Sequence, residues 1–232
     1  MRSGYLQALL DLFYPEYCVA CQRRARDLLC GACYEDMPEI DRPVCGRCGM
    51  PSAFEVHGCD SCRSRDYAFE GARAALRYDG VGQEIVHAIK YRGRVEAVER
   101  LAVPLMFGAL AEGVPEYRKF DSVAPVPMRR GRRLKRGFNQ AELLARGVAE
   151  RINLPVSDKL RSVRKTMDQV ELTAEERMAN VRGAYAARGS CSGRVLLVDD
   201  VFTTGATLDS CSRALVEAGA EEVFALSLCR TC

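Results

Sequence analysis

The sequence of 232 residues contains no apolar run long enough to cross a membrane. Its most apolar segment, residues 101–114, includes Pro104 and Glu112, whereas a membrane span needs about 20 mostly apolar residues. The N-terminal apolar stretch contains Asp11 and is not followed by a small-residue cleavage site, so it does not resemble a secretory signal. We therefore expect no membrane insertion, a cytoplasmic location and an amphipathic helix over residues 1–16.

The sequence also has little net charge, so its overall charge of +3 indicates no class of partner. The local distribution is more informative, because six of the eight residues from 129 to 136 are basic: Arg129, Arg130, Arg132, Arg133, Lys135 and Arg136. They cannot all contact one small phosphate. Two interpretations remain open: a solvated face with one or two contacts to a pyrophosphate, or a surface that pairs with the phosphates of DNA.

The order of predicted elements indicates an α/β fold. An apolar fraction of 48% is sufficient for the core of one medium domain. Strands are predicted over residues 71–78, 122–126, 183–187, 194–199 and 222–228. Helices are predicted over residues 82–91, 94–111, 139–152, 174–180 and 206–218, the second bent or broken at Pro104. Because strands and helices alternate, we expect a mostly parallel sheet; residues 155–172 are polar and irregular.

The sequence contains twelve cysteines. In a cytoplasmic chain this number favours metal binding over a disulfide framework. Eight of the cysteines form four C-x-x-C pairs. These eight are Cys18, Cys21, Cys30, Cys33, Cys45, Cys48, Cys59 and Cys62. Two such pairs complete a tetrahedral all-thiolate site, so we predict two structural Zn²⁺ sites; disulfides are the alternative. The spacing permits either sequential or interleaved pairing. His57 is not needed as a ligand, and the remaining cysteines, with Cys229 in a strand and Cys232 at the terminus, are expected to be structural.

Residues 195–207 carry the strongest indication of a binding site. The apolar run Val195–Val198 is followed by Asp199 and Asp200 and by a small hydroxyl-rich turn, after which a helix begins. Parallel α/β sheets bind ligands at this point, where amide groups at a helix N-terminus suit a phosphate. The neighbouring carboxylates suit sugar hydroxyls. The segment therefore predicts a site for a phosphorylated ribose.

Several motifs extend this prediction to a family. The segment D-D-V-F-T-T-G-A-T resembles the phosphoribosyl pyrophosphate (PRPP) loop of type I phosphoribosyltransferases. The chain as a whole resembles the ComF family of competence proteins. This resemblance rests on the cysteine pairs, Lys90–Gly93, Pro125–Pro127, Arg136–Gln140, and Gln169, Arg177, Asn180 and Gly183, with Tyr185 where Phe is commoner. It implies a type I phosphoribosyltransferase-like, mostly parallel α/β sheet over residues 66–232, preceded by a double zinc ribbon over residues 17–65.

The resemblance also implies roles for individual residues. Asp199 and Asp200 accept hydrogen bonds from the ribose hydroxyls. The 5′-phosphate lies against the loop formed by Thr203, Thr204, Gly205, Ala206 and Thr207, and Mg²⁺ accompanies the pyrophosphate. Residues 155–172 act as a hood, and the candidates for pyrophosphate contact are Lys90, Arg136, Arg164 and Lys165. The candidates for DNA contact are Arg129, Arg130, Arg132, Arg133 and Lys135.

Three functions are compatible with these features. The first is a competence protein that binds PRPP and handles internalised single-stranded DNA, for which the resemblance implies a helicase partner. The second is a metabolic phosphoribosyltransferase with an unidentified acceptor. The third is a zinc-ribbon adaptor whose pocket senses a ligand. No side chain is evident as a catalytic base: His87 has the right chemistry, but a single histidine in a helix is more often structural. Binding of PRPP is thus a firmer expectation than its turnover.

Overall fold

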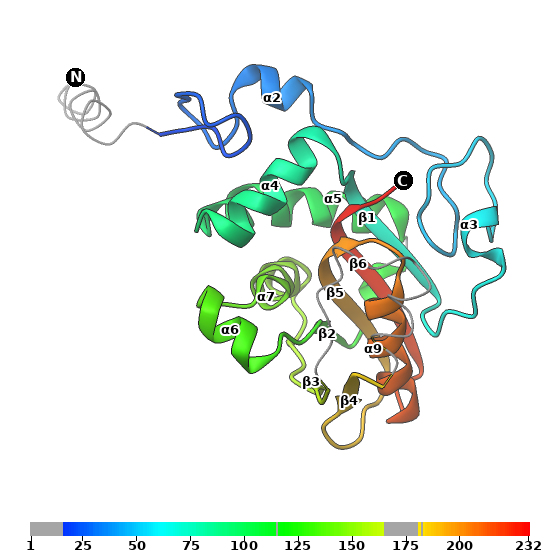
Figure 1. Ribbon diagram of the computed structural model, residues 1–232. Helices are drawn as coiled ribbons and strands as arrows, with labels where there is room; N and C mark the ends of the chain where they lie inside the picture. The colour runs from blue at the N-terminus through cyan, green and yellow to red at the C-terminus, as the bar shows by residue number, and fades with distance from the viewer. Residues whose placement is uncertain (1–15, 115, 165–180, 182) are drawn as a thin grey trace.

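Four parallel strands form the central sheet of the molecule (Figure 1). The computed structural model describes residues 16–114, 116–164, 181 and 183–232. The sheet has the order β1-β6-β5-β2, with β1 at Gly71–Arg77, β6 at Glu222–Arg230, β5 at Arg194–Phe202 and β2 at Ser122–Pro125. The predicted parallel α/β fold is confirmed. Predictions for residues 1–15 and 165–180 lie outside the described residues.

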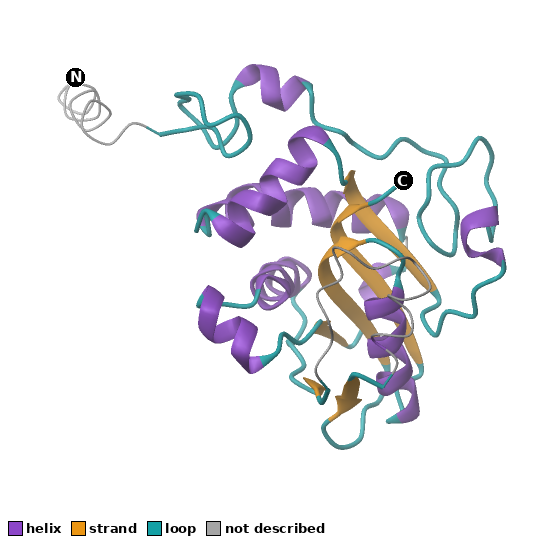
Figure 2. Cartoon of the chain, viewed as in Figure 1, coloured by secondary structure: helices purple, strands orange, loops and turns teal. Residues whose placement is uncertain are grey.

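Both faces of the sheet are covered, which explains the continuous apolar run in β5 (Figure 2). Leu196 and Val198 face one side, where the core is completed by α4 (Gly80–Tyr91), α5 (Val103–Gly113) and α7 (Gln140–Ile152). Val195 and Leu197 face the other side, against α9 (Ala206–Glu217) and the second group of cysteines. Among the described helices, none combines the length and apolarity that a membrane crossing requires.

β5 is longer than predicted, and this places the two acids inside it. The sequence suggested that the strand ends at residue 199, but its pairing with β6 continues to Phe202, which lies opposite Arg230. Asp199 lies opposite Ser227 in this register. A polar residue was misread as the end of the strand because the hydrogen bonds of a strand belong to the backbone and continue beneath polar side chains.

A second, two-stranded sheet lies outside the parallel one. β3 (Leu160–Ser162) pairs antiparallel with β4 (Tyr185–Ala187). The expectation that residues 155–172 are irregular is therefore wrong for β3. Three residues are too few to display the alternation of polar and apolar side chains by which a strand is recognised.

The remaining elements are short. α6 (Arg130–Arg136) contains most of the basic run. A π-helical turn, η1 (Val98–Ala102), leads directly into α5, and Pro104, which has no N–H to donate, lies in the first turn of α5. α2 (Gly31–Glu35) and α3 (Asp60–Arg63) lie among the cysteine pairs, and η2 (Tyr117–Lys119) precedes β2.

Candidate functional site

The eight paired cysteines come together in two groups of four. Cys18, Cys21, Cys30 and Cys33 form the first group, and Cys45, Cys48, Cys59 and Cys62 form the second. Within each group the ligand atoms all lie within 4.8 Å of one another. The structure thus selects sequential pairing over the interleaved alternative. His57 belongs to neither group.

The sulfur separations fit zinc. A tetrahedral site with Zn–S bonds of about 2.3 Å places its sulfurs about 3.8 Å apart. The Sγ atoms of Cys45 and Cys62 are 3.7 Å apart, those of Cys48 and Cys59 3.5 Å, and those of Cys21 and Cys30 3.7 Å. The backbone N–H of Arg23 lowers the pKa of Cys21, whereas burial raises the pKa of Cys33 in the same group, so a bound cation would be needed to keep all four sulfurs as thiolates. Two zinc ions bound by four thiolates each would cross-link the N-terminal segment, which has little core of its own.

The other four cysteines lie outside these groups. Cys211 and Cys229 are buried, Cys191 is partly buried and Cys232 is exposed. Cys229 is a residue of β6, as predicted, and Cys232 follows the strand at the end of the chain.

Asp199 and Asp200 project from opposite faces of β5, because successive side chains of a strand alternate. Asp200 lies towards α4, where its Oδ1 is 2.8 Å from the Nζ of Lys90. Both side chains of this ion pair are less than one-fifth exposed. The backbone N–H of Asp200 donates to Asp199 Oδ1 at 2.9 Å.

Burial and the neighbouring charge make Asp199 unusual. Burial raises the pKa of Asp199 to about 7, with the charge of Asp200 acting in the same direction and outweighing the opposing effect of Lys90. Burial alone would lower the pKa of Lys90, but the charges of Asp200 and Asp199 outweigh it and raise this pKa. The acid pair is therefore a destabilising feature that is only partly offset by one lysine, an arrangement typical of binding sites.

The loop of residues 203–207 connects β5 to α9. Gly205 adopts a left-handed conformation with φ of 78° immediately before the first residue of the helix. A Cβ atom at this position would lie 2.9 Å from Phe202 Cζ and 3.0 Å from Tyr67 Cε1. The turn consequently requires glycine for both its backbone angle and its packing.

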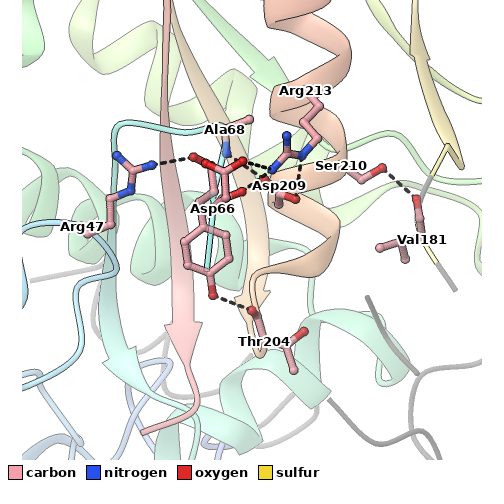
Figure 3. Close-up of polar contacts among 9 residues, drawn as sticks. Arg47, Asp66, Ala68, Val181, Thr204, Asp209, Ser210 and Arg213 are labelled. Carbon is pink, nitrogen blue, oxygen red and sulfur yellow. Dashed lines mark hydrogen bonds and ion pairs between the residues drawn. The ribbon is translucent and has the colours of Figure 1, made fainter. Parts of the chain in front are cut away.

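The carbonyl oxygen of Thr204 is held by the segment that follows the second cysteine group (Figure 3). It accepts hydrogen bonds from the hydroxyl of Tyr67 at 2.8 Å and from Nη1 of Arg65 at 2.7 Å. One turn into α9, the Asp209 carboxylate accepts hydrogen bonds from the amide of Ala68 at 2.7 Å and from Arg213 at 3.1 Å (Figure 3). No local sequence pattern indicates the contacts made by residues 65–68, because they join residues about 140 positions apart in the chain.

After β2 the chain forms α6 and then α7. Asn139 precedes α7 at the capping position, but its Nδ2 donates instead to the carbonyl of Val126 at 3.0 Å. Arg136 donates to Gln140 Oε1 at 3.0 Å, and its guanidinium lies 5.1 Å from the ring centre of Tyr91. Tyr91 is 69% exposed, so an aromatic ring borders the basic helix. Phe138 packs against the core.

The other predicted residues are more scattered. Arg164 is exposed just beyond β3, and Lys165 lies outside the described residues. Nε2 of His87 is 3.3 Å from the hydroxyl of Tyr78, and its ring packs edge-on against Tyr91. These contacts agree with a structural role for this histidine.

Comparisons with known proteins agree with this organisation. Residues 9–63 match the double zinc ribbon domain family. The DNA utilization protein YhgH of Salmonella typhimurium is 30% identical over 191 residues, covering 81% of this chain and 84% of that protein. The chain belongs to the ComF family of competence proteins.

Other members of the ComF family match over most of their length. Competence protein F of Haemophilus influenzae is 26% identical over 228 residues, covering 94% of this chain and 98% of the relative. Competence protein ComFC of Bacillus subtilis is 28% identical over 209 residues, covering 88% and 84% respectively. Among solved structures, glutamine PRPP amidotransferase from B. subtilis aligns over 60% of this chain with a TM-score of 0.39 and 24% identity. The chain spans only 30% of that enzyme's length.

Proposed function

We propose that this ComF-family protein binds PRPP with Mg²⁺ at the carboxyl end of β5 and handles single-stranded DNA along α6. The names of its relatives, competence protein and DNA utilization protein, support a role in the use of DNA. Thiolate zinc sites are typical of a reducing compartment, which supports a cytoplasmic location. The helicase partner implied by the family resemblance stays a prediction.

The main support for the PRPP site is the acid pair next to a phosphate-sized loop. Burying Asp199 beside Asp200 opposes folding, and a polyhydroxyl ligand with a divalent cation would offset that effect. The loop residues Thr203–Thr207 begin three residues after Asp200, with hydroxyl groups and the left-handed Gly205 immediately before α9. Ribose hydroxyls at the acids and a phosphate at the loop match the order of these groups along the chain.

The donor chemistry also suits Mg²⁺, which prefers oxygen ligands. The carboxylates of Asp199 and Asp200 precede the loop by a few residues, whereas the Asp209 carboxylate that follows the loop already accepts hydrogen bonds from Ala68 and Arg213. When bound, Mg²⁺ would neutralise charge on the pyrophosphate. Lys90 already provides one positive charge beside the acid pair, because its Nζ forms an ion pair with Asp200. The proposal covers binding; transfer would require an acceptor that displaces pyrophosphate from the anomeric carbon.

Calorimetric titration with PRPP and Mg²⁺ tests the site. We expect the Asp199→Asn/Asp200→Asn variant to lose binding by at least tenfold, because charged acceptors for two hydroxyls are removed. Asp158→Asn is the matched control, since Asp158 is exposed in the segment before β3. Unchanged binding in the double variant would show that the acid pair is not the site. A pyrophosphate-release assay, with and without DNA, separates binding from turnover.

The DNA half of the proposal rests on the exposed basic residues of α6 and on Tyr91 beside them. Single-strand binding combines phosphate pairing with stacking of bases on aromatic rings. Fluorescence anisotropy with a labelled oligothymidylate measures it. We expect affinity to fall with salt and to be weaker in Arg132→Gln/Lys135→Gln. Absence of binding by the wild type at low salt would refute this half.

A further inference from the structure

A cavity of about 630 Å³ lies between α6 and the β3–β4 hairpin, outside the acid pair and its loop. Three arginines from separate segments line it: Arg130 from α6, Arg161 from β3 and Arg188 from the residue after β4. The other described residues that line it are Ser162, Ala187 and Gly189, and none of these six residues carries a carboxylate. In the described part of the chain, no ion pair neutralises any of the three guanidinium groups.

The hairpin register explains why the basic residues gather on one side. Arg161 lies opposite Ala186, and the amide of Arg188 donates to the carbonyl of Lys159 at 2.6 Å. Residues opposite one another, and those two positions along, share a face of an antiparallel pair. Lys159, Arg161 and Arg188 therefore share one face. Leu160 belongs to the other face, where it is buried in the core beside α9.

The small residue opposite Arg161 adds to this arrangement. Ala186 leaves space beside the guanidinium, whereas a carboxylate at this cross-strand position would neutralise it. Among the residues that the structure describes, the three guanidinium groups have no counter-charge, and their mutual repulsion contributes no stability to the fold. An anionic ligand would offset the repulsion.

The basic surface continues beyond the cavity along α6. Arg130 begins this helix, and Arg136 at its other end lies against the exposed ring of Tyr91. Between them, Arg132, Arg133 and Lys135 are exposed, although Arg133 also pairs with Glu142 at 3.2 Å. A surface with a cluster of arginines at one end and an aromatic ring at the other is too extended for one small anion.

We propose that Arg130, Arg161 and Arg188 bind consecutive backbone phosphates of single-stranded nucleic acid, as an extension of the surface formed by α6. The guanidinium group matches phosphate geometry and presents several donors in one plane. This inference rests on the DNA half of the proposed function. It adds the β3–β4 hairpin, which sequence motifs had not connected with nucleic acid, as a second wall of the binding surface.

Salt-dependent binding of an oligothymidylate to the full chain tests the proposal. Each lost phosphate contact lowers the slope of log affinity against log salt by about 0.7 for single strands, so Arg161→Gln/Arg188→Gln is expected to lower it by about 1.4. Affinity at low salt should fall about tenfold. Arg161→Lys/Arg188→Lys should restore most of the slope, since the charges remain.

Arg118→Gln is the matched control. Arg118 is exposed, but it lies before the start of β2, whereas α6 follows the end of β2. All variants alter exposed side chains, and their melting temperatures verify folding. If Arg161→Gln/Arg188→Gln binds like the control while Arg132→Gln/Lys135→Gln is weakened, the hairpin inference fails and the proposed function stands. If the wild type binds no oligonucleotide at low salt, both fail.

A competitor separates nucleic acid from other polyanions. Polyglutamate and inorganic pyrophosphate are added to the labelled complex. The proposal expects unlabelled oligothymidylate to compete far better than either. Binding of polyglutamate that depends on Arg161 and Arg188, without a matching loss of oligonucleotide binding, would assign the cavity to an acidic protein partner and overturn the proposal.

Discussion

The hydroxyl of Tyr67 donates a 2.8 Å hydrogen bond to the carbonyl oxygen of Thr204, 137 residues later in the chain. The Tyr67 ring stacks on Phe69 with centroids 4.5 Å apart and meets Phe202 edge-on at 6.4 Å. Phe202 is the last residue of β5, and Thr204 belongs to the proposed phosphate loop. A residue just beyond the second cysteine group thus stabilises the loop through both a polar and an aromatic contact.

Removing only the hydroxyl should have a small effect. In Tyr67→Phe the ring packing remains and Arg65 still donates to Thr204, so we expect a loss of about 1 kcal/mol in the free energy of unfolding. Tyr67→Ala should lose about 3–5 kcal/mol, because a buried aromatic side chain is removed. Urea unfolding measures both. Tyr91→Phe, at an exposed position, should change stability by less than about 0.5 kcal/mol; an equal loss there would contradict the role assigned to Tyr67.

Gly205→Ala should destabilise the protein by about 1–3 kcal/mol and weaken PRPP binding. The added Cβ would contact Phe202 and Tyr67 too closely, and the left-handed backbone is unfavourable for alanine. Gly131→Ala is a control of opposite sign: Gly131 lies within α6 with no atom within 4 Å of an added Cβ, so stability should rise by about 0.5–1 kcal/mol. Thermal unfolding and calorimetric titration provide the readouts, and a Gly205→Ala variant that folds and binds normally would disprove the requirement.

The free energy of unfolding of Asp199→Asn should exceed that of the wild type at high pH but not at low pH. The pKa of Asp199 is about 7 in the folded state and near 4 in the unfolded state, so the folded state binds more protons between these values. The contribution of this group to stability therefore falls as pH rises from about 4 to 7 and is constant above that range. Near pH 4 the variant and wild type should be similarly stable.

At pH 8 the variant should be more stable than the wild type by about 2–4 kcal/mol. Denaturant unfolding across pH 4–8 measures the difference, and Asp158→Asn should show no comparable trend. A difference between Asp199→Asn and wild type that does not grow with pH would mean that the carboxylate is not kept in an unfavourable environment.

The two zinc sites should contribute unequally to stability. Cys45, Cys48 and Cys62 are buried in the same core as Tyr67 and Phe69, whereas Cys18 and Cys33 belong to a small separate cluster. Cys21→Ser and Cys62→Ser should each reduce the zinc content from about two to about one per chain. Only Cys62→Ser should also lower the melting temperature of the α/β domain, because Cys62 is part of its core.

Elemental analysis and calorimetry give these two results. Cys232→Ser is the control, because this cysteine is exposed and outside both groups, and it should retain both metals. Retention of two zinc ions by Cys62→Ser, or equal thermal effects of the two site variants, would contradict the assignment.

Features encoded over a few residues were predictable from the sequence. A C-x-x-C pair presents two thiolates to one ion whatever follows it, so the zinc ligands were evident from spacing. The parallel sheet followed from alternating strands and helices, and the acid pair and loop are contiguous in β5 and the turn after it. The two acids nevertheless appeared to end the strand, because side-chain polarity obscured the continuing backbone pairing with β6.

The tertiary structure alone decided which cysteine pairs share an ion, that β3 pairs with β4, that Tyr67 and Arg65 hold Thr204, and that Lys90 reaches Asp200. It also brought Arg130, Arg161 and Arg188 around one cavity. Each of these contacts joins segments whose meeting depends on how the sheet orders its strands and which helices cover each face. Chemistry is encoded locally, but proximity between distant residues arises only when the whole core packs.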